Sequence, residues 1–410
     1  MPRDDEHSCR ICGQTNLEVF LDLGDSPLAD RLLTKAQLQE KEPVYPLQVA
    51  FCRNCTLVQI LETVDPEELF CKDYPYYSSV SSSLLEHSRQ NVLELIARRR
   101  LDAHSFVVEL ASNDGYLLRN YVDAGVPCLG IDPAEGPARA AERIGVPTRC
   151  TFFSEDLAQS LCHEGKKADV IHANNVLAHV ADTNGFVEGI RLLLKDDGVA
   201  VIEVPYVKNL IDHCEFDTIY HQHLCYFSVT ALDHLFRRHG LYLNDVRPLA
   251  IHGGSLRLYV ELREAVTSSV RDYLAEEKAC GADTFEYYCR FAQAVANIKE
   301  RLRSLLAGLK SDRRRIMAYA AAAKGCTLLN YVGIDREWVD AIADKNPYKQ
   351  GKYMTGMHQP IVATEQVLES MPDYLLLLAW NFKDEIMSQQ TEYVARGGKF
   401  IIPIPEPVIV

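Results

Sequence analysis

Residues 219–228 read IYHQHLCYFS and gather two histidines, two tyrosines, a glutamine and a cysteine within ten positions. Such a set could bind a metal ion, transfer protons or form an aromatic corner of a core. A metal site would want a third ligand and an extended strand, and nothing in the sequence specifically supplies them. A histidine near its ordinary pKa suits proton transfer at neutral pH. The choice depends on what the rest of the chain brings to this stretch.

Four cysteines form two C-x2-C pairs, CRIC (Cys9, Cys12) and CRNC (Cys52, Cys55). Two such knuckles let four thiolates reach tetrahedral positions around one ion, which predicts a closed, structural Zn²⁺ site. A redox dithiol is the alternative, although redox C-x-x-C motifs usually occur singly. The other cysteines are predicted to be small buried hydrophobic residues: Cys71, Cys128, Cys150, Cys162, Cys214, Cys225, Cys280, Cys289 and Cys326.

The stretch SFVVELASNDGYLL predicts a strand from Ser105, a loop of small residues and a helix beginning at Tyr116, the opening of a doubly wound α/β domain. The next strand, CLGID, ends in Asp132, an acid placed to accept hydrogen bonds from a ribose diol. The loop has a single glycine, Gly115, where a dinucleotide fingerprint needs three, so NAD and FAD are disfavoured. An adenosyl ligand without phosphates does not need the glycine cradle. This points to S-adenosylmethionine, with a Rossmann-like domain whose site has decayed as the alternative.

The predicted cofactor contacts lie on this loop and at the strand ends beside it. They are Glu109, Ala111, Ser112, Asn113, Gly115, Asp132, Pro133, Asn174 and Asn175.

The composition of the 410 residues is that of a globular chain, with 47% hydrophobic and 24% charged residues. This length predicts roughly two to three domains. The net charge of −14 argues against nucleic-acid binding, which depends on cation contacts to phosphates. The N-terminus has no apolar signal segment, and no apolar run approaches the length of a membrane span. We therefore expect a cytoplasmic protein with no membrane partner.

The C-terminal third begins with a long charged helix, DTFEYYCRFAQAVANIKERLRSLLAGLKS. RRIMAYAAAAKGCTLLNYVGI then predicts a second strand, loop and helix of Rossmann type. The runs WVDAIADKN, YLLLLAW and GKFIIPIP complete a pattern of parallel strands alternating with helices. Lys324, Asn346 and Lys349 could meet a nucleotide diphosphate as point charges and an amide donor. The alternative is that they are solvated loop residues.

Several motifs in order along the chain resemble the deoxysugar C-methyltransferases of antibiotic pathways, which act on nucleotide-linked keto-deoxyhexoses. These motifs are CRIC…CRNC, YPYYSSVS (74–81), ELASNDG, NNVLAHV, YHQHLCYFS, IHGGSLR (251–257) and AAAKGCTLLNY (321–331). The resemblance implies an α/β chain in three parts. They are an N-terminal zinc-binding module (1–70), a central class I Rossmann-like methyltransferase domain (71–305) and a C-terminal Rossmann-like α/β domain (306–410) that helps to hold the nucleotide-sugar. We expect a monomer.

The reaction that this family implies is removal of a proton beside a ketone, followed by attack of the enolate on the sulfonium methyl. By resemblance His223 is the expected base, and Tyr220 either shares this role or polarises the ketone. His179 is the next candidate in the pocket, and Tyr74 would line the sugar site. The predicted substrate contacts are Tyr77, Ser78, Gln222, Lys324, Asn346 and Lys349.

The remaining residues of the stretch are expected to be structural, with His221 a satisfied histidine and Tyr226 and Phe227 part of the core. The chain departs from the family pattern at Gln222, where glutamate is usual. A glutamine can hold an imidazole by a hydrogen bond but cannot stabilise an imidazolium by charge, so it should not raise the histidine's pKa. We therefore expect a base of lower proton affinity, or a larger share of the work for Tyr220.

Two further departures lie in the C-terminal domain, where the family commonly has glycine at Ala320 and proline–glycine at Thr355-Gly356. An added methyl group in a tight turn can reshape a binding loop, so these departures bear on the substrate more than on the reaction. Two alternative functions remain open. One is methyl transfer to oxygen or nitrogen of another small metabolite, and the other is a non-catalytic binding protein.

Overall fold

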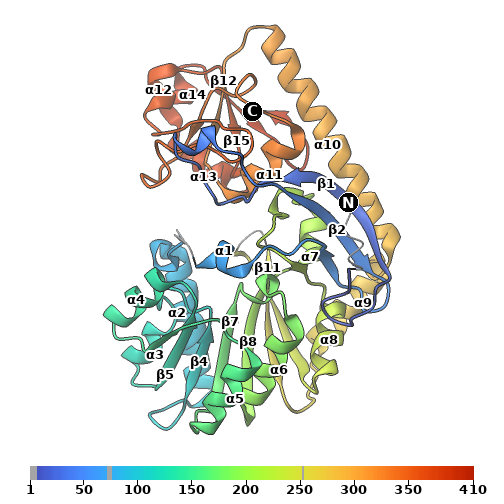
Figure 1. Cartoon of the computed structure of the whole chain (residues 1–410), viewed down its shortest axis with the longest axis vertical. Coiled ribbons are helices and arrows are strands. Elements are labelled where there is room, and N and C mark those ends of the chain that lie inside the picture. The colour runs from blue at the N-terminus through green and yellow to red at the C-terminus, as the bar shows by residue number, and fades with distance from the viewer. Residues whose placement is uncertain (1–6, 72–75, 252–253) are drawn as a thin grey trace.

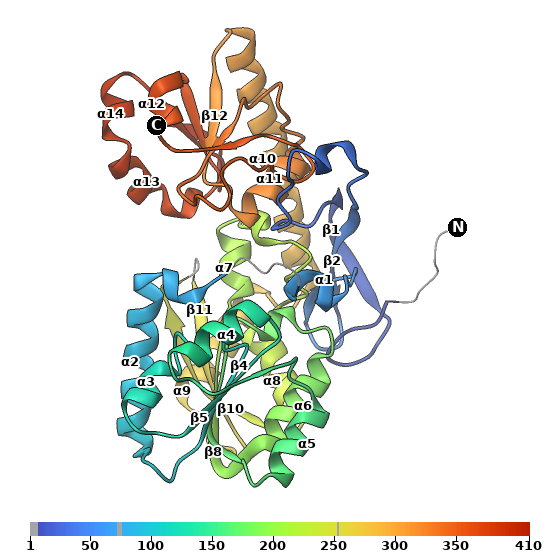
Figure 2. The same ribbon diagram turned by 60° about the vertical axis from the view of Figure 1, so that its left-hand side comes forward.

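The computed structural model describes residues 7–71, 76–251 and 254–410 and contains three β-sheets (Figure 1). In Figures 1 and 2 the central domain lies at the bottom, the C-terminal domain at the top, and the N-terminal strands at the side of their junction. The expected α/β architecture of three parts is confirmed.

The N-terminal sheet is antiparallel, in the order β1-β2-β3-β9. Its strands are β1 (Leu17–Ser26), β2 (Tyr45–Cys52), β3 (Val58–Ile60) and β9 (Cys225–Tyr226). The edge strand β9 belongs to residues 219–228, here called the histidine stretch, and Val58 pairs with Tyr226 while Gln59 pairs with Cys225. A two-residue strand cannot stand alone, so the zinc-binding module supplies the partner that fixes this part of the histidine stretch.

The central sheet has the order β10-β11-β8-β7-β4-β5-β6, parallel except at its β10–β11 edge. The strands are β4 (Val107–Leu110), β5 (Cys128–Asp132), β6 (Thr148–Cys150), β7 (Ala168–Asn174), β8 (Leu194–Pro205), β10 (Tyr242–Leu249) and β11 (Ser255–Glu261). Its inner strands β4 and β5 are buried at every position, because helices cover both faces of the sheet. Their carboxyl ends meet at one edge, where the predicted cofactor loop lies.

Helices of the central domain connect these strands. They are α2 (Ser82–Arg99), α3 (Arg119–Asp123), α4 (Glu135–Arg143), α5 (Glu155–His163), α6 (Thr183–Leu193), α7 (Val207–Asp212), α8 (Val229–Arg238) and α9 (Ser268–Cys280), and α1 (Pro66–Phe70) precedes them at the end of the zinc-binding module. The helix expected from Tyr116 begins only at Arg119, because the cofactor loop continues through turns that bury Leu117 and Leu118. Ser228 ends the histidine stretch and caps α8, since its Oγ accepts the Ala231 N–H at 3.0 Å.

The C-terminal sheet has the order β14-β13-β12-β15-β16-β17, parallel except for β17. The strands are β12 (Ile316–Tyr319), β13 (Ile342–Ala343), β14 (Ile361–Val362), β15 (Tyr374–Leu377), β16 (Lys399–Ile402) and β17 (Val408–Ile409). The helices are α11 (Ala323–Val332), α12 (Gln366–Ser370), α13 (Lys383–Gln389) and α14 (Thr391–Ala395). The strand, loop and helix predicted around AYAAAAKG are therefore present as β12 and α11.

The long helix α10 (Phe285–Ser311) runs along the side of the molecule in Figure 1 and leads into the C-terminal domain. Its buried stripe includes Tyr288, Val295 and Leu302, and Tyr288 packs on Phe51 of the N-terminal sheet with ring centroids 5.0 Å apart. An apolar stripe at this spacing is the usual sign of a helix that packs on a core along one face. No helix within the described ranges is both long and apolar enough to cross a membrane.

The expectation that all scattered cysteines are buried is wrong for Cys150 and Cys289, which are exposed. Cys150 ends the edge strand β6, and Cys289 lies on the outer side of α10. Both positions face water because no other element in the described part of the chain covers that edge or that helix face. Cys128, Cys225 and Cys326 are buried as expected.

Candidate functional site

The four cysteines of the two knuckles converge on one point. Their Sγ atoms lie within 4.8 Å of one another, with Cys9 and Cys55 3.4 Å apart and Cys12 and Cys52 3.5 Å apart. Cys9, Cys52 and Cys55 are buried, so the group is closed and offers no open position for a substrate. Four thiols in this arrangement form the tetracysteine zinc site that the spacing predicted.

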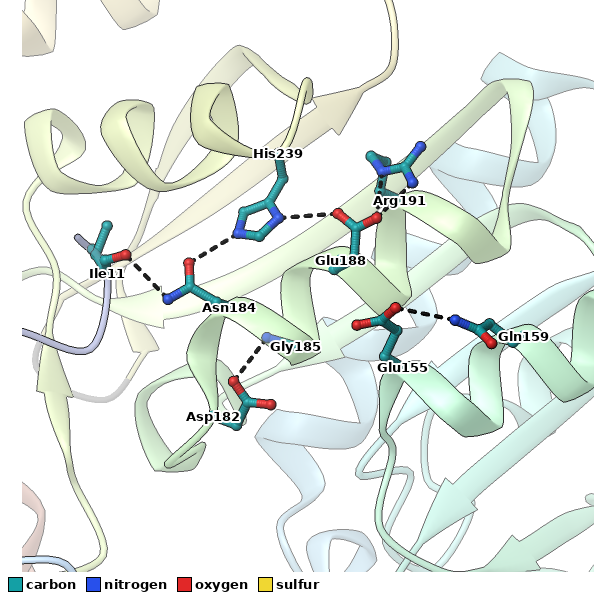
Figure 3. Close-up of polar contacts among 9 residues, drawn as sticks. All are labelled: Ile11, Glu155, Gln159, Asp182, Asn184, Gly185, Glu188, Arg191 and His239. Atoms are coloured by element: carbon teal, nitrogen blue, oxygen red, sulfur yellow. Dashed lines mark hydrogen bonds and ion pairs between the residues drawn. The ribbon is translucent and has the colours of Figure 1, made fainter. Parts of the chain in front are cut away.

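The first knuckle is fastened to the central domain by a chain of polar contacts (Figure 3). Asn184 Nδ2 on α6 donates to the carbonyl oxygens of Arg10 (2.8 Å) and Ile11 (3.1 Å). His239 Nε2 lies 2.9 Å from Asn184 Oδ1, and His239 Nδ1 lies 3.0 Å from Glu188 Oε2. These contacts reach the backbone between Cys9 and Cys12. The packing of the zinc-binding module on α6 therefore depends on the turn that these two cysteines hold in shape.

The cofactor loop follows β4 and is tied to Asp132 at the end of β5. The two carboxylate oxygens of Asp132 accept the backbone N–H groups of Asn113 and Ala134, each at 2.8 Å. Ala111, Asn113 and Gly115 have φ values of 57°, 49° and 78°, so the loop turns tightly through left-handed conformations. A Cβ on Gly115 would lie 3.1 Å from a methyl group of Val146, so glycine lets the loop pack closely against the turn that follows α4.

Three acidic residues, Glu109, Asp114 and Asp132, are buried at this edge. Burial, followed by the charges of Asp132 and Asp114, raises the pKa of Glu109 well above its ordinary value. Burial also raises the pKa of Asp132, against its two backbone hydrogen bonds. A crowded set of carboxyls disfavours an anionic pyrophosphate and favours a ligand with positive charge and hydrogen-bond donors. S-adenosylmethionine carries a sulfonium, an ammonium and ribose hydroxyls, and the residues present fit it.

The other residues predicted to contact the cofactor lie around this loop in different ways. Ser112 is fully buried, and its Oγ lies 2.4 Å from where a Cβ on Gly130 would be, so this side chain packs under the loop against β5. Pro133 continues the loop beyond Asp132. Asn174 ends β7, and the N–H of Asn175 donates to the Glu203 carbonyl at 2.8 Å, which holds Asn175 at a φ of 51°. These residues border the loop, and their cofactor contacts remain predictions.

His223 of the histidine stretch meets His179, which lies in the turn after β7, with ring centroids 4.9 Å apart. His223 Nδ1–H donates to the carbonyl of Thr218 at 2.8 Å, and His179 Nδ1–H donates to the carbonyl of Gln222 at 2.6 Å. In a neutral ring these bonds leave the basic lone pair on Nε2 of both histidines. Burial lowers the pKa of His179.

The Tyr220 ring lies against the His223 ring, with centroids 4.1 Å apart and planes at 33°. Phe70 of α1 packs edge-on to His179 at 5.7 Å. His221 points the other way, because its Nε2 donates to the carbonyl of Pro46 at 3.1 Å and its ring packs edge-on to Tyr45. The stretch thus places alternate side chains on different neighbours. His221 is buried against the zinc-binding module, but the expectation that it is a satisfied histidine holds only for Nε2, because Nδ1 has no hydrogen-bond partner among the described residues.

The segment that follows α1 lies along the cofactor loop. Tyr74 falls outside the described residues. The Ser78 N–H donates to Asn113 Oδ1 at 2.9 Å, and the hydroxyl of Tyr77 lies over Gly136 at the start of α4. Tyr77 and Ser78 therefore border the cofactor loop, and their predicted substrate contacts stay predictions.

The C-terminal residues predicted for a diphosphate each have protein contacts. Lys324 Nζ lies 4.5 Å from the centroid of the Trp380 ring, and Lys349 Nζ donates to the Ala321 carbonyl at 2.7 Å. Asn346 Oδ1 accepts the Tyr348 N–H at 2.9 Å and so closes its own turn. Ala320 has a φ of 70°, a left-handed conformation that suits the glycine common in the family.

The sequence reasoning missed a buried charged group beside the cofactor edge. Arg257 Nε donates to Glu203 Oε1 at 2.8 Å, and His87 Nε2 lies 2.9 Å from the same oxygen. Burial would raise the pKa of Glu203, but the His87 hydrogen bond and the Arg257 charge outweigh it and hold the pKa below its ordinary value. An acid in the apolar run VIEVP and the arginine of IHGGSLR were the available signals.

It also missed a contact between domains. Trp380 Nε1 donates to Asp217 Oδ2 at 2.7 Å, and Asp217 is fully buried. Burial raises the pKa of Asp217, while Lys324 and the indole N–H oppose this shift. Asp217 comes just before the histidine stretch, so this contact joins the stretch to the C-terminal domain.

Comparison with known proteins gives family matches over three ranges. They are a zinc-binding domain (9–70), a methyltransferase domain (84–246) and the C-methyltransferase C-terminal domain (250–405). The C-methyltransferase NovU of Streptomyces niveus is 34% identical over 405 residues, which cover 98% of this chain and 96% of that protein.

Two solved structures are each similar to 44% of the chain. A methyltransferase of Haloferax volcanii, in complex with the Trm112 methyltransferase activator, is 17% identical, with 44% of this chain and 93% of that chain covered and a TM-score of 0.36. The magnesium protoporphyrin IX methyltransferase of Synechocystis with bound S-adenosylmethionine is 13% identical, with 44% and 81% covered and a TM-score of 0.34.

Proposed function

We propose, since this chain belongs to the family of S-adenosylmethionine-dependent C-methyltransferases, that it methylates the carbon beside the ketone of a nucleotide-linked keto-deoxysugar. The observation that carries this proposal is the tautomer of His223. A carbonyl fixes its Nδ1–H, so Nε2 is the nitrogen that accepts a proton. Methyl transfer to carbon requires such a base, because a proton beside a ketone is too weakly acidic to leave unaided.

In the proposed reaction His223 Nε2 takes the proton from the carbon, and the electron pair of the C–H bond moves toward the ketone oxygen. Tyr220, stacked beside His223, donates its hydroxyl hydrogen bond to that oxygen as negative charge develops. S-adenosylmethionine, when bound, supplies the electrophilic methyl group, and S-adenosylhomocysteine is left when the new C–C bond forms. His223 then returns its proton to solvent.

His179 supports this step from the side. Because burial lowers its pKa, His179 stays neutral at pH 7 and does not repel the imidazolium that forms on His223. Its hydrogen bond to the Gln222 carbonyl also fixes one end of the stretch. The Nδ1–H groups of both rings donate to backbone carbonyls, so neither ring needs a carboxylate at position 222 to hold its orientation.

The nucleotide end of the substrate is assigned to the C-terminal domain, with Lys324, Lys349 and Asn346 as the proposed contacts. Lys324 and Lys349 are cations near the amino end of α11, where backbone N–H groups also favour a phosphate. Their present partners are an aromatic face and a carbonyl oxygen, which a diphosphate would outcompete as an anion. We therefore propose that the central domain binds the cofactor, that the C-terminal domain binds the nucleotide, and that the histidine stretch lies between the two.

The test is solvent exchange followed by mass spectrometry. A thymidine-diphosphate 4-keto-deoxysugar is incubated in heavy water with the enzyme and S-adenosylhomocysteine. We expect deuterium uptake beside the ketone, lost by at least about 100-fold in His223→Asn, since general-base catalysis contributes about 10²- to 10⁴-fold. His163→Asn, at an exposed helix end, is the matched control and should exchange like the wild type.

Absence of uptake in a wild-type protein that binds S-adenosylhomocysteine would contradict the proposal. Methyl transfer to a heteroatom would then be the better interpretation. Loss of S-adenosylhomocysteine binding in His223→Asn would contradict the assignment of His223 as the base.

A further inference from the structure

Thr327 of α11 makes a contact across the boundary between the C-terminal domain and the central domain. Its Oγ1 donates to the carbonyl of Ile219 at 2.9 Å, and both residues are buried. A threonine inside a helix can turn its hydroxyl to an earlier carbonyl of the same helix. Here the hydroxyl instead donates to a carbonyl 108 residues away in the chain, so this contact belongs to the packing of the two domains.

The Ile219 carbonyl lies between the two side chains assigned to the chemistry. Its peptide group leads into Tyr220, whose ring stacks on His223. The preceding peptide group contains the Thr218 carbonyl, which accepts His223 Nδ1–H at 2.8 Å. Because each peptide group is planar, only the φ and ψ angles of Ile219 separate the anchored peptide from the Thr218 carbonyl. A shift of the anchored carbonyl would therefore reach both the acceptor of the histidine and the backbone of the tyrosine.

A second contact with the C-terminal domain holds the other side of this turn. Asp217 Oδ2 accepts the Trp380 indole N–H at 2.7 Å, and Asp217 is fully buried. Within the turn, the Ile219 N–H donates to the Phe216 carbonyl at 3.0 Å. Thr218, whose carbonyl accepts from the histidine, thus lies directly between two residues that the C-terminal domain holds in place.

The helix that supplies Thr327 also carries a residue proposed to meet the nucleotide. Lys324 lies about one turn before Thr327 in α11, and its Nζ lies 4.5 Å from the centroid of the Trp380 ring. The proposed nucleotide contact and both anchors of the turn therefore lie at neighbouring positions of the C-terminal domain. A base needs such support, because a small displacement from the productive geometry can remove much of its rate.

We propose that Thr327 is a positioning residue that fixes the tautomer of His223 from the C-terminal domain. Its hydroxyl holds the Ile219 carbonyl, and this contact keeps the Thr218 carbonyl turned toward His223 Nδ1–H. Nε2 is thereby kept as the nitrogen that accepts the proton of the substrate. This inference rests on the proposed function, in which His223 is the base. It makes the C-terminal domain a support of proton transfer as well as the site of the nucleotide.

The test compares Thr327→Val, which removes the hydroxyl and keeps the shape, with Thr327→Ser, which keeps the hydroxyl. In Thr327→Val, we expect the rate of deuterium exchange at saturating keto-sugar to fall about 10-fold, with KM within about 2-fold of wild type. Thr327→Ser should exchange within about 2-fold of the wild-type rate, because its hydroxyl can make the same hydrogen bond. S-adenosylhomocysteine binding at the wild-type affinity shows that each variant is folded.

Thr284→Val is the matched control. The Thr284 hydroxyl also donates to a backbone carbonyl, that of Gly281 at 2.6 Å, but it does so at the exposed start of α10. This variant loses the same kind of hydrogen bond outside the turn that supports His223. Its exchange rate and its KM should therefore equal those of the wild type.

The tautomer itself is read from the ring-nitrogen NMR shifts of His223, in protein with isotope-labelled histidine and at a pH where the ring is neutral. His223→Asn assigns the signals. The wild type should show one tautomer, with the proton on Nδ1, because that nitrogen donates to a carbonyl. Thr327→Val should show both tautomers, whereas Thr327→Ser and Thr284→Val should match the wild type.

The proposal is overturned if Thr327→Val keeps either the wild-type tautomer or the wild-type exchange rate at saturation. A variant in which only KM rises would show that the hydroxyl merely joins the two domains. If the wild type does not exchange deuterium, the proposed function fails. The NMR comparison then still decides whether Thr327 fixes the His223 ring, because it requires no substrate.

Discussion

The cofactor loop and the histidine stretch are built in different ways. The loop is held inside one sheet, by Asp132 at the end of β5 and by turns that continue from β4. The histidine stretch and the residues just before it depend on the other two domains, because β3 pairs with β9, Thr327 Oγ1 donates to the Ile219 carbonyl at 2.9 Å and Trp380 donates to Asp217. Cofactor binding should therefore survive changes that disable proton abstraction, because the two sites depend on different contacts.

Loss of the zinc site should separate the two regions most strongly. In Cys52→Ser, we expect zinc to fall from about one equivalent to none and deuterium exchange to drop to background, because β3 no longer holds β9. S-adenosylhomocysteine affinity should change by less than about 10-fold, or 1.4 kcal/mol. Metal analysis, exchange and calorimetry measure the three quantities. Cys289→Ser, at an exposed position, is the control, and normal exchange in a zinc-free protein would contradict the argument.

Asp132→Asn should have the reverse effect of Cys52→Ser, because it should weaken cofactor binding and leave deuterium exchange intact. Its carboxylate holds the loop by two N–H groups and is the predicted ribose acceptor, so one lost acceptor should weaken S-adenosylhomocysteine binding about 10- to 100-fold. Deuterium exchange at saturating S-adenosylhomocysteine should remain near wild type. The control is Asp123→Asn, exposed at the end of α3. An equal loss in binding and exchange would mean that the two regions are one cooperative site.

Trp380→Phe tests the contact between the histidine stretch and the C-terminal domain. Removing the indole N–H leaves the buried Asp217 carboxyl without that donor, which costs about 1–3 kcal/mol in urea unfolding. KM for the nucleotide-sugar should rise, while S-adenosylhomocysteine affinity stays unchanged. Trp338→Phe is the matched control. If both variants unfold at the same urea concentration, the hydrogen bond from Trp380 to Asp217 does not contribute this free energy of unfolding.

Acid should destabilise the cofactor region through His172. Burial depresses the pKa of His172 from 6.5 to about 3, and its Nε2 lies 2.9 Å from the hydroxyl of Tyr121. Between these values the unfolded chain binds a proton that the folded protein does not, so stability rises with pH. Lowering the pH from 6.5 to 5 should therefore cost about 1.5 kcal/mol through this group. Urea unfolding at both pH values should show a smaller loss in His172→Gln and an unchanged one in His163→Gln.

Local patterns were sufficient for the parts of the site that one element or one turn builds. The C-x2-C spacing places Cys9, Cys12, Cys52 and Cys55 around one ion, because a knuckle is a local turn that needs only its own residues. Asp132 was found in the same way, since the end of an apolar strand is where a doubly wound sheet presents its ligand contacts. The histidine pair was found only through the family resemblance.

The same patterns failed where distance along the chain is large. Nothing near Lys324 in the sequence predicts the face of Trp380, and nothing near Asp217 predicts the hydrogen bond from the Trp380 indole. The same limit explains why local patterns did not predict the exposure of Cys150 and Cys289 or the start of α3 at Arg119. Burial and helix ends depend on which elements pack beside them, and a local pattern does not contain that information.

By itself, the sequence determined the zinc ligands, the order of strands and helices, the acidic cofactor edge and the residue types available for proton transfer. These follow from spacing, periodicity and charge, which act over a few residues. Only the tertiary structure decided that His223 turns Nδ1 to a carbonyl, that β9 completes the N-terminal sheet and that Trp380 donates to the buried Asp217. Those contacts join segments far apart in the chain, and they form because the burial of three packed domains outweighs the entropy of bringing such segments together.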